Sequence, residues 1–127
     1  SQSGSSHTGG GSGSGKVSVQ DLHFTKYVDS ASPTLQLKCC DGTHVKEAVL
    51  VLRKSGTTPL EYLKITFNDL IVSSIQSGGS GSEDRLTESI SLNFAKFKTE
   101  YTKQKADGSA DGGAITAGWN IPKNEKV

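Results

Sequence analysis

The chain has 127 residues, a length that fits a single domain, and only 32% of its residues are apolar. Fourteen basic against 13 acidic side chains leave a net charge of +1, which argues against nucleic acid or an anionic membrane surface as a partner. The longest aliphatic run, residues 48–52, is far shorter than the ~20 residues that a membrane helix needs, and the polar amino terminus shows no secretory signal peptide.

Residues 1–15 are rich in glycine and serine, a composition typical of a flexible linker. The stretch from Gly10 to Lys16 has the spacing of a phosphate-binding loop. Val17, however, stands where such a loop needs Ser or Thr to place a hydroxyl on magnesium, and the predicted element that follows is a strand instead of a helix. We therefore expect no nucleotide site here.

Residues 16–28 have the alternation of a strand, with a change of face that predicts a β-bulge at Gln20 and Asp21. A short helix is expected at about residues 32–41. Ser32 is suited to its N-cap, Pro33 to its first position, and Gly42 to the left-handed position that ends a helix.

Cys39 and Cys40 are the only cysteines, and they are neighbours in the sequence. Together with His23 and His44 they could supply four metal ligands, but the spacing matches no known ligand pattern. We expect two small free thiols, no metal and no cofactor.

Residues 45–54 form the next predicted strand, which is apolar on both faces and is therefore expected in the middle of a sheet. Two long strands follow at residues 60–76 and 86–101, joined by a turn at residues 77–85. In both strands the apolar residues change from one face to the other, as a bulge causes. The face-changing residues are Leu70, Val72, Phe97 and Tyr101. Either another subunit covers them or they are ordinary core residues.

Four ordered motifs carry a family resemblance. Residues 72–88, VSSIQSGGSGSEDRLTE, resemble the signature hairpin of Hcp, the haemolysin-coregulated protein family that forms the inner tube of the type VI secretion system. The other three motifs agree with this family in order: FTKYVD at 24–29, QKADG at 104–108 and GWNI at 118–121.

The resemblance implies a mainly β fold, a small antiparallel β-barrel of two packed sheets with one short flanking α-helix, which assembles into a ring. Residues 1–127 would form a single Hcp-like domain with three parts. Residues 1–15 are an extended loop that touches the next ring, 16–103 the barrel, and 104–127 a turn-rich segment whose Trp119 and Ile121 pack back on the barrel. The chain lacks methionine, and two opening strands of the family pattern are missing before Ser1, which suggests a processed or shortened chain.

The implied function is structural. Homohexameric rings would stack into a tube that carries effector proteins, inside a contractile sheath and below a spike protein, and would pass from the bacterial cytoplasm to the outside. No catalytic residue, nucleic acid partner or membrane insertion is expected. The residues expected at the lateral ring contact are Leu70, Val72, Arg85, Phe97 and Tyr101. Those expected at ring stacking are Ser5, Ser6, His7, Thr8, Gly78, Gly79 and Glu83.

Some alternatives stay open. Arg85 could bind a carboxylate of the next subunit, or it could pair locally with Asp84 in a solvated turn. A tail-tube protein of a phage-like particle would share the ring architecture, and a monomeric β-barrel that binds a small ligand would not assemble at all. Annular particles of purified protein would exclude the monomeric β-barrel and leave the secretion tube and the phage-like tail tube.

Overall fold

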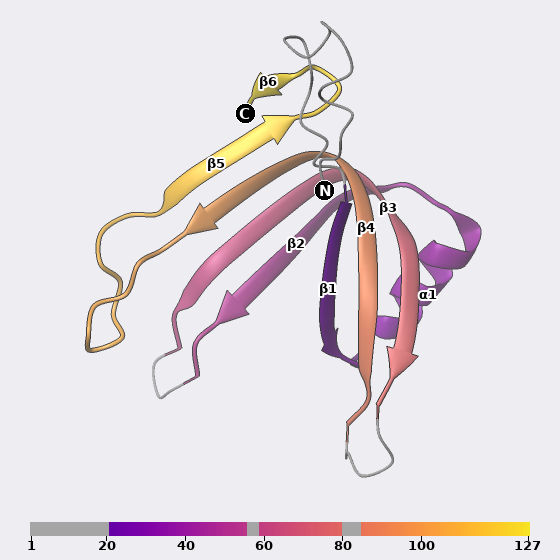
Figure 1. Cartoon of the computed structure of the whole chain (residues 1–127), viewed down its shortest axis with the longest axis horizontal. Coiled ribbons are helices and arrows are strands. Elements are labelled where there is room, and N and C mark those ends of the chain that lie inside the picture. Colours follow the sequence, from indigo (N-terminus) through magenta and orange to yellow (C-terminus); the bar gives the residue numbers. More distant parts are fainter. Residues whose placement is uncertain (1–20, 56–58, 80–84) are drawn as a thin grey trace, which may run out of the picture.

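The computed structural model describes residues 21–55, 59–79 and 85–127. They form a mainly β fold with one short helix, as expected from the sequence (Figure 1). The elements, in chain order, are β1 (Asp21–Tyr27), α1 (Ser32–Asp41), β2 (Val45–Arg53), β3 (Glu61–Gly78), β4 (Thr87–Tyr101), β5 (Ile115–Asn120) and β6 (Glu125–Lys126).

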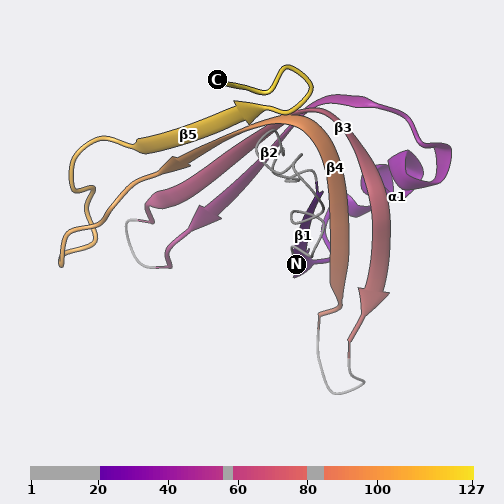
Figure 2. The same cartoon turned by 45° about the horizontal axis from the view of Figure 1, so that its top comes forward.

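One antiparallel sheet holds all the described strands, in the order β2-β3-β4-β5-β6 with β1 also paired to β4. β1 lies along the first half of β4 and β5 along its second half, whereas β2 lies along the first half of β3. Two packed sheets were expected; here a single sheet bends across the long strands β3 and β4, so that its two arms point in different directions (Figure 2). In the described part of the chain, β2 pairs only with β3, and so it is not the central strand that its sequence suggested.

The bend explains why apolar residues change face in β3. Phe67 is buried on one parity, and Leu70 and Val72 are buried on the other. Between them Asp69 adopts a left-handed backbone with φ of 53°, which Asp tolerates better than most residues. A further register shift between Val72 and Ser74 brings Ile75 back toward the same core. Both parities of this strand therefore serve one core.

The core lies at the bend, where three aromatic rings meet. The centroids of Phe67 and Phe94 are 4.8 Å apart, and Phe97 meets Phe94 edge-on at 5.8 Å. Ile90 and Leu92 complete it from β4. In β4 the buried apolar residues, Ile90, Leu92 and Phe94, are even-numbered, whereas Phe97 packs on the core from the other parity, opposite Phe67 in the ladder. The change of face predicted in β4 thus occurs at the bend, opposite the change of face in β3.

Helix α1 lies beside β3 and ends as predicted at Gly42, whose φ is 68° and whose amide donates to the Lys38 carbonyl (Figure 1). Its start differs from the prediction, because Ala31 is the N-cap and has no side-chain capping bond. Ser32 lies inside the first turn, where its hydroxyl donates to Glu88 of β4 instead. Leu35 and Cys39 are the helix residues that pack on the core.

The carboxyl-terminal segment contains a strand, β5, which the sequence did not predict. Gly118 in its middle is the reason that β5 can lie against β4, because a Cβ there would come within 2.9 Å of the Phe97 carbonyl oxygen. Val127, which follows β6, lies against the same position and donates its amide to the Gly118 carbonyl. Ile121 packs against the core as expected, whereas Trp119 stays partly exposed. In the described part of the chain, no helix is long and apolar enough to span a membrane.

Candidate subunit interface

Leu70 and Val72 were expected at a lateral contact between subunits, but they lie in the core of a single subunit. Their exposed fractions are 2% and 3%. Both side chains line a partly open, mostly apolar pocket of about 400 Å³ between α1, β2 and the bend of the sheet. The prediction of a lateral contact is therefore wrong for these two residues. They are core residues, which was the alternative, because the irregular backbone of β3 turns them inward.

Phe97 and Tyr101, in contrast, belong to an apolar surface that continues beyond the core. In the ladder between β4 and β5, Phe97 lies directly opposite Trp119 and Tyr101 directly opposite Ile115, so the four side chains share one face. Phe97 is partly buried against the core, whereas Tyr101, Ile115 and Trp119 are between 38% and 59% exposed. We call these four residues the distal-arm surface.

The distal-arm surface is the outward end of a regular set of cross-strand rows. Its inner row runs through Ala48, Phe67, Phe97 and Trp119, and its outer row through Leu52, Leu63, Tyr101 and Ile115. Burial falls from Phe67 in the inner row to Ile115 in the outer row. Exposed apolar side chains that adjoin one another in this way are a common mark of protein–protein contact.

Arg85 lies at the other end of β4, at the base of the β3–β4 hairpin. Its guanidinium carbon is 3.8 Å from the centroid of the Tyr27 ring, a cation–π contact within the subunit. Tyr27 is the last residue of β1, and the next residue, Val28, donates its amide to the Leu86 carbonyl. A planar guanidinium stacked on a ring keeps N–H groups at its edge for a carboxylate acceptor.

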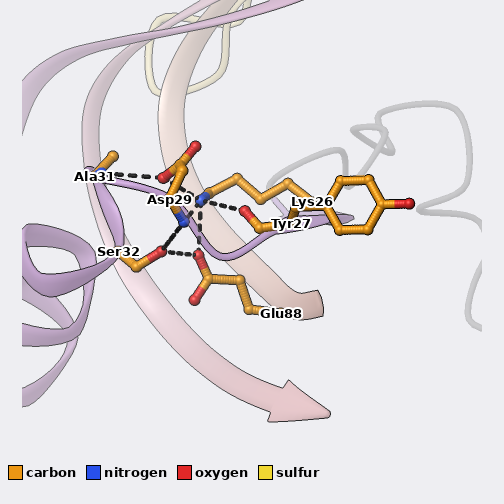
Figure 3. Close-up of polar contacts among 6 residues, drawn as sticks. All are labelled: Lys26, Tyr27, Asp29, Ala31, Ser32 and Glu88. Atoms are coloured by element: carbon orange, nitrogen blue, oxygen red, sulfur yellow. Dashed lines mark hydrogen bonds and ion pairs between the residues drawn. The ribbon is translucent and has the colours of Figure 1, made fainter. Parts of the chain in front are cut away.

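A polar cluster with two buried members, Ser32 and Glu88, lies beside this hairpin base and joins β1, α1 and β4 (Figure 3). The Lys26 ammonium is 2.7 Å from the Glu88 carboxylate and 2.7 Å from that of Asp29, and it donates to the Tyr27 carbonyl at 3.1 Å. The Ser32 hydroxyl donates to Glu88 at 2.5 Å and accepts the Asp29 amide at 3.0 Å. The Glu88 side chain is fully buried, and its Oε1 has no hydrogen-bond partner among the described residues.

The charges in this cluster favour one another. Burial works against the charged form of Glu88, but hydrogen bonds from Lys26 and Ser32 and the charge of Lys26 outweigh it and hold its pKa below the usual 4.5. Burial likewise opposes the charge on Lys26, yet its bonds to Asp29 and Glu88 raise its pKa above 10.5. The hydrogen bond from Lys26 is the largest cause that lowers the pKa of Asp29. The cluster is therefore ionised at neutral pH.

Of the residues expected at ring stacking, Gly78 and Gly79 lie exposed at the end of β3, where the Gly78 carbonyl accepts the Thr87 hydroxyl. The remainder, Ser5, Ser6, His7, Thr8 and Glu83, lie outside the described residues, as do the proposed bulge at Gln20 and the Gly10–Lys16 stretch.

The two thiols are free, with Cys39 partly buried and Cys40 exposed. Within residues 21–55, 59–79 and 85–127, no group of three or more His, Cys, Asp or Glu side chains is placed to hold a metal ion.

Sequence reasoning missed Ile115 as a candidate contact residue and missed the whole polar cluster. Ile115, Ala117 and Trp119 do alternate, but Gly118 interrupts the run and made the segment look like a turn. The ion pair between Lys26 and Glu88 joins residues far apart in the chain, and only the pairing of β1 with β4 brings them together.

Comparisons with known proteins agree with this fold. The profile of the family described as "Type VI secretion system effector, Hcp" matches residues 1–101. The protein hcp1 of Pseudomonas aeruginosa is 54% identical over 110 residues, which cover 86% of this chain and 68% of that relative. The crystal structure of Hcp1 from Salmonella typhimurium is 42% identical with a TM-score of 0.73, over 89% of this chain and 76% of that one.

A type VI secretion system effector from Yersinia pestis is 39% identical with a TM-score of 0.64, over 82% of this chain and 73% of that one. The agreement in sequence and the agreement in structure both cover most of the chain. The chain therefore belongs to the Hcp family of the type VI secretion system.

Proposed function

We propose that copies of this type VI secretion tube subunit bind one another through the distal-arm surface and close into a hexameric ring. The carrying observation is the exposure of Tyr101, Ile115 and Trp119 side by side at the end of an apolar face whose other residues are buried or partly buried. In water such a surface gains free energy when it is covered, at roughly 25 cal/mol per Å² of apolar area. A ring that closes leaves no uncovered lateral surface, which ends growth in that direction.

In this proposal the chain is a single domain, 1–127, with a structural role and no catalytic one. Rings stack through Gly78 and Gly79 together with Ser5 to Thr8 and Glu83, and the stacked rings carry effector proteins in their bore. A contractile sheath and a spike protein are the other partners, and the tube passes from the bacterial cytoplasm to the outside. Membership of the Hcp family supports each of these assignments.

The test uses the 127-residue chain and its Ile115→Asp variant in light-scattering chromatography and negative-stain imaging. The wild-type chain should form annular particles with six times the subunit mass, and the variant should be monomeric, because a carboxylate on the contact must be desolvated. Leu37→Asp is the matched control, since Leu37 is equally exposed but lies on α1, outside the surface. A wild-type chain that stays monomeric at every concentration would contradict the ring and would favour the monomeric binding module.

A further inference from the structure

Helix α1 is attached to the sheet by little apolar contact. Among the residues of α1, Ser32 alone is buried, and it is polar. Leu35 and Cys39 are only partly buried against the core, and Leu37 is 62% exposed. The N-cap, Ala31, has no side-chain acceptor for the first amides of the helix. Because short helices are stabilised mainly by packing of an apolar face, α1 needs another attachment to the sheet.

That attachment is the hydroxyl of Ser32, which reaches a buried carboxylate. It donates to Glu88 Oε2 of β4 at 2.5 Å, and both residues are buried (Figure 3). The same hydroxyl accepts the Asp29 amide at 3.0 Å, so it also fixes the chain where it enters the helix. The Lys26 ammonium of β1 lies 2.7 Å from the same carboxylate oxygen. The start of α1 is therefore fastened to two strands through one oxygen atom.

Glu88 occupies a position in β4 where an apolar side chain is expected. It shares the inward face of the strand with Ile90, Leu92 and Phe94, all of which are buried. An apolar residue there would be buried without the cost of removing a charge from water, so the carboxylate is not needed to fill the core. The best-attested use of such a buried ionic group is to specify one arrangement or to switch between two. Here the arrangement that it specifies is the docked position of α1.

Helix α1 also forms one wall of the mostly apolar pocket. Leu35 lines the pocket from α1, Leu50 lines it from β2, and Leu70 and Val72 line it from β3. Movement of α1 away from the sheet would uncover Leu70 and Val72, which are now buried. The strand pairing of the described sheet involves no residue of the helix. The helix can therefore move away without breaking a strand-to-strand hydrogen bond of that sheet.

We propose that α1 is a lid on this pocket, held closed by the hydrogen bond from Ser32 to Glu88, and that it opens as a unit while the sheet stays folded. Segments with few buried apolar contacts open locally at a lower free energy than the core of the same protein. This inference concerns a single subunit and does not depend on the proposed ring. The distal-arm surface belongs to the other arm of the sheet, so opening of the lid leaves that surface in place (Figures 1 and 2).

The two thiols of α1 make the opening measurable. Cys40 is exposed and Cys39 is partly buried, so a Cys40→Ser variant keeps Cys39 as its only thiol. The rate at which Cys39 reacts with the thiol reagent DTNB then reports how often the lid opens. Adding Ser32→Ala should raise this rate about tenfold at neutral pH, because the closed state then leaves the buried Glu88 with one donor fewer. Ser30→Ala is the matched control, since Ser30 is exposed in the turn before α1 and should leave the rate unchanged.

The urea dependence of this reaction separates opening of the lid from unfolding of the whole subunit. Opening exposes little surface, so low concentrations of urea should change the Cys39 rate much less than they change the equilibrium constant of global unfolding. In the wild-type chain, amides of α1 should also exchange hydrogen faster than those of β3 and β4.

The outcomes decide both parts of the proposal. An unchanged Cys39 rate in the Ser32→Ala variant would overturn the role of Ser32. A Cys39 rate that follows global unfolding in urea, or equal protection of α1 and the long strands from hydrogen exchange, would overturn the lid. The urea and exchange measurements use chains that keep Ser32, so they decide the proposal even where Ser32→Ala does not fold.

Discussion

The two arms of the sheet are built from the same two long strands and yet serve different ends. In the arm that holds β1, the side chains of β4 that face inward, from Glu88 to Phe94, are buried, and the buried Glu88 carboxylate is paired with Lys26. In the arm that holds β5, the corresponding face opens progressively from Phe97 to Ile115. Among the described residues, the first arm is therefore covered within one subunit, whereas the second presents apolar area that is left exposed. In the proposed ring, the residues for stability and those for assembly lie at different places along one strand.

The largest expected effect on stability comes from the buried arm. Lys26→Met leaves the Glu88 carboxylate buried without its cation, which should lower the free energy of unfolding by about 3–5 kcal/mol. Urea denaturation of the wild type and the variant measures this change in the free energy of unfolding. Arg53→Met is the matched control, because the Arg53–Glu61 pair at 2.6 Å is exposed and should cost less than about 1 kcal/mol. Equal effects for the two pairs would show that the arms do not differ as described.

The same cluster predicts a pH dependence. The folded pKa of Glu88 lies below its unfolded value of 4.5, so its contribution to stability is fully present above pH 4.5 and is lost as pH falls through the folded pKa. Lys26 has a raised pKa, so its contribution is fully present below pH 10.5 and is lost as pH rises through the folded value. Stability measured across pH should fall at both ends, and Glu88→Gln should flatten the acid side. An unchanged acid slope in that variant would count against the ionised cluster.

Core truncation at the bend should come next. Leu70→Ala removes a fully buried side chain and should lower stability by about 2–5 kcal/mol, with the cost rising with the cavity that is left. Ile115→Ala removes a side chain of the same volume from the exposed arm and should change monomer stability by about 0.5 kcal/mol or less. Thermal melts compare the stabilities of the two variants, at protein concentrations too low for assembly. A small effect at Leu70 would return that residue to the list of contact candidates.

A smaller effect is expected where β5 meets β4. Gly118→Ala places a methyl group within 2.9 Å of the Phe97 carbonyl oxygen, a backbone atom that cannot easily move. Overpacking of this kind typically costs about 1–3 kcal/mol, and here it should loosen β5 and β6 first. Hydrogen exchange should therefore speed up in residues 115–126 while the amides of β1 stay protected. Uniform acceleration over the whole sheet would instead indicate that the distal arm unfolds together with the core.

Local sequence patterns were enough to predict the helix and the long strands. Alternation placed β3 and β4 within two residues of their observed ends, and Gly42 marked the end of α1 because a left-handed φ favours glycine. The same pattern could not show whether the apolar residues on the second face of these strands lie in the core or at a contact. A bulge turns a residue inward or outward depending on the bend of the whole sheet, and the sequence near Asp69 contains no sign of that bend.

The candidate contact was predicted in part. Phe97, Tyr101 and Arg85 were chosen from the sequence and remain predictions, while the structure moved Leu70 and Val72 to the core. Ile115 and Trp119 became candidates only when strand pairing showed which side chains share a face. Residue order along the chain does not contain that information, since pairing between distant strands depends on tertiary structure.

We propose above that the distal-arm surface, at the exposed end of the sheet, binds another copy of this chain. Sedimentation velocity of the wild-type chain over a range of concentrations, followed through the fluorescence of Trp119, tests it most directly. If the distal-arm surface is covered in the ring, we expect a single large species of ring size, and the Trp119 emission should shift to the blue as this species appears. A large species whose Trp119 emission matches that of the dilute monomer would contradict the account, because the ring would then form without covering the distal arm.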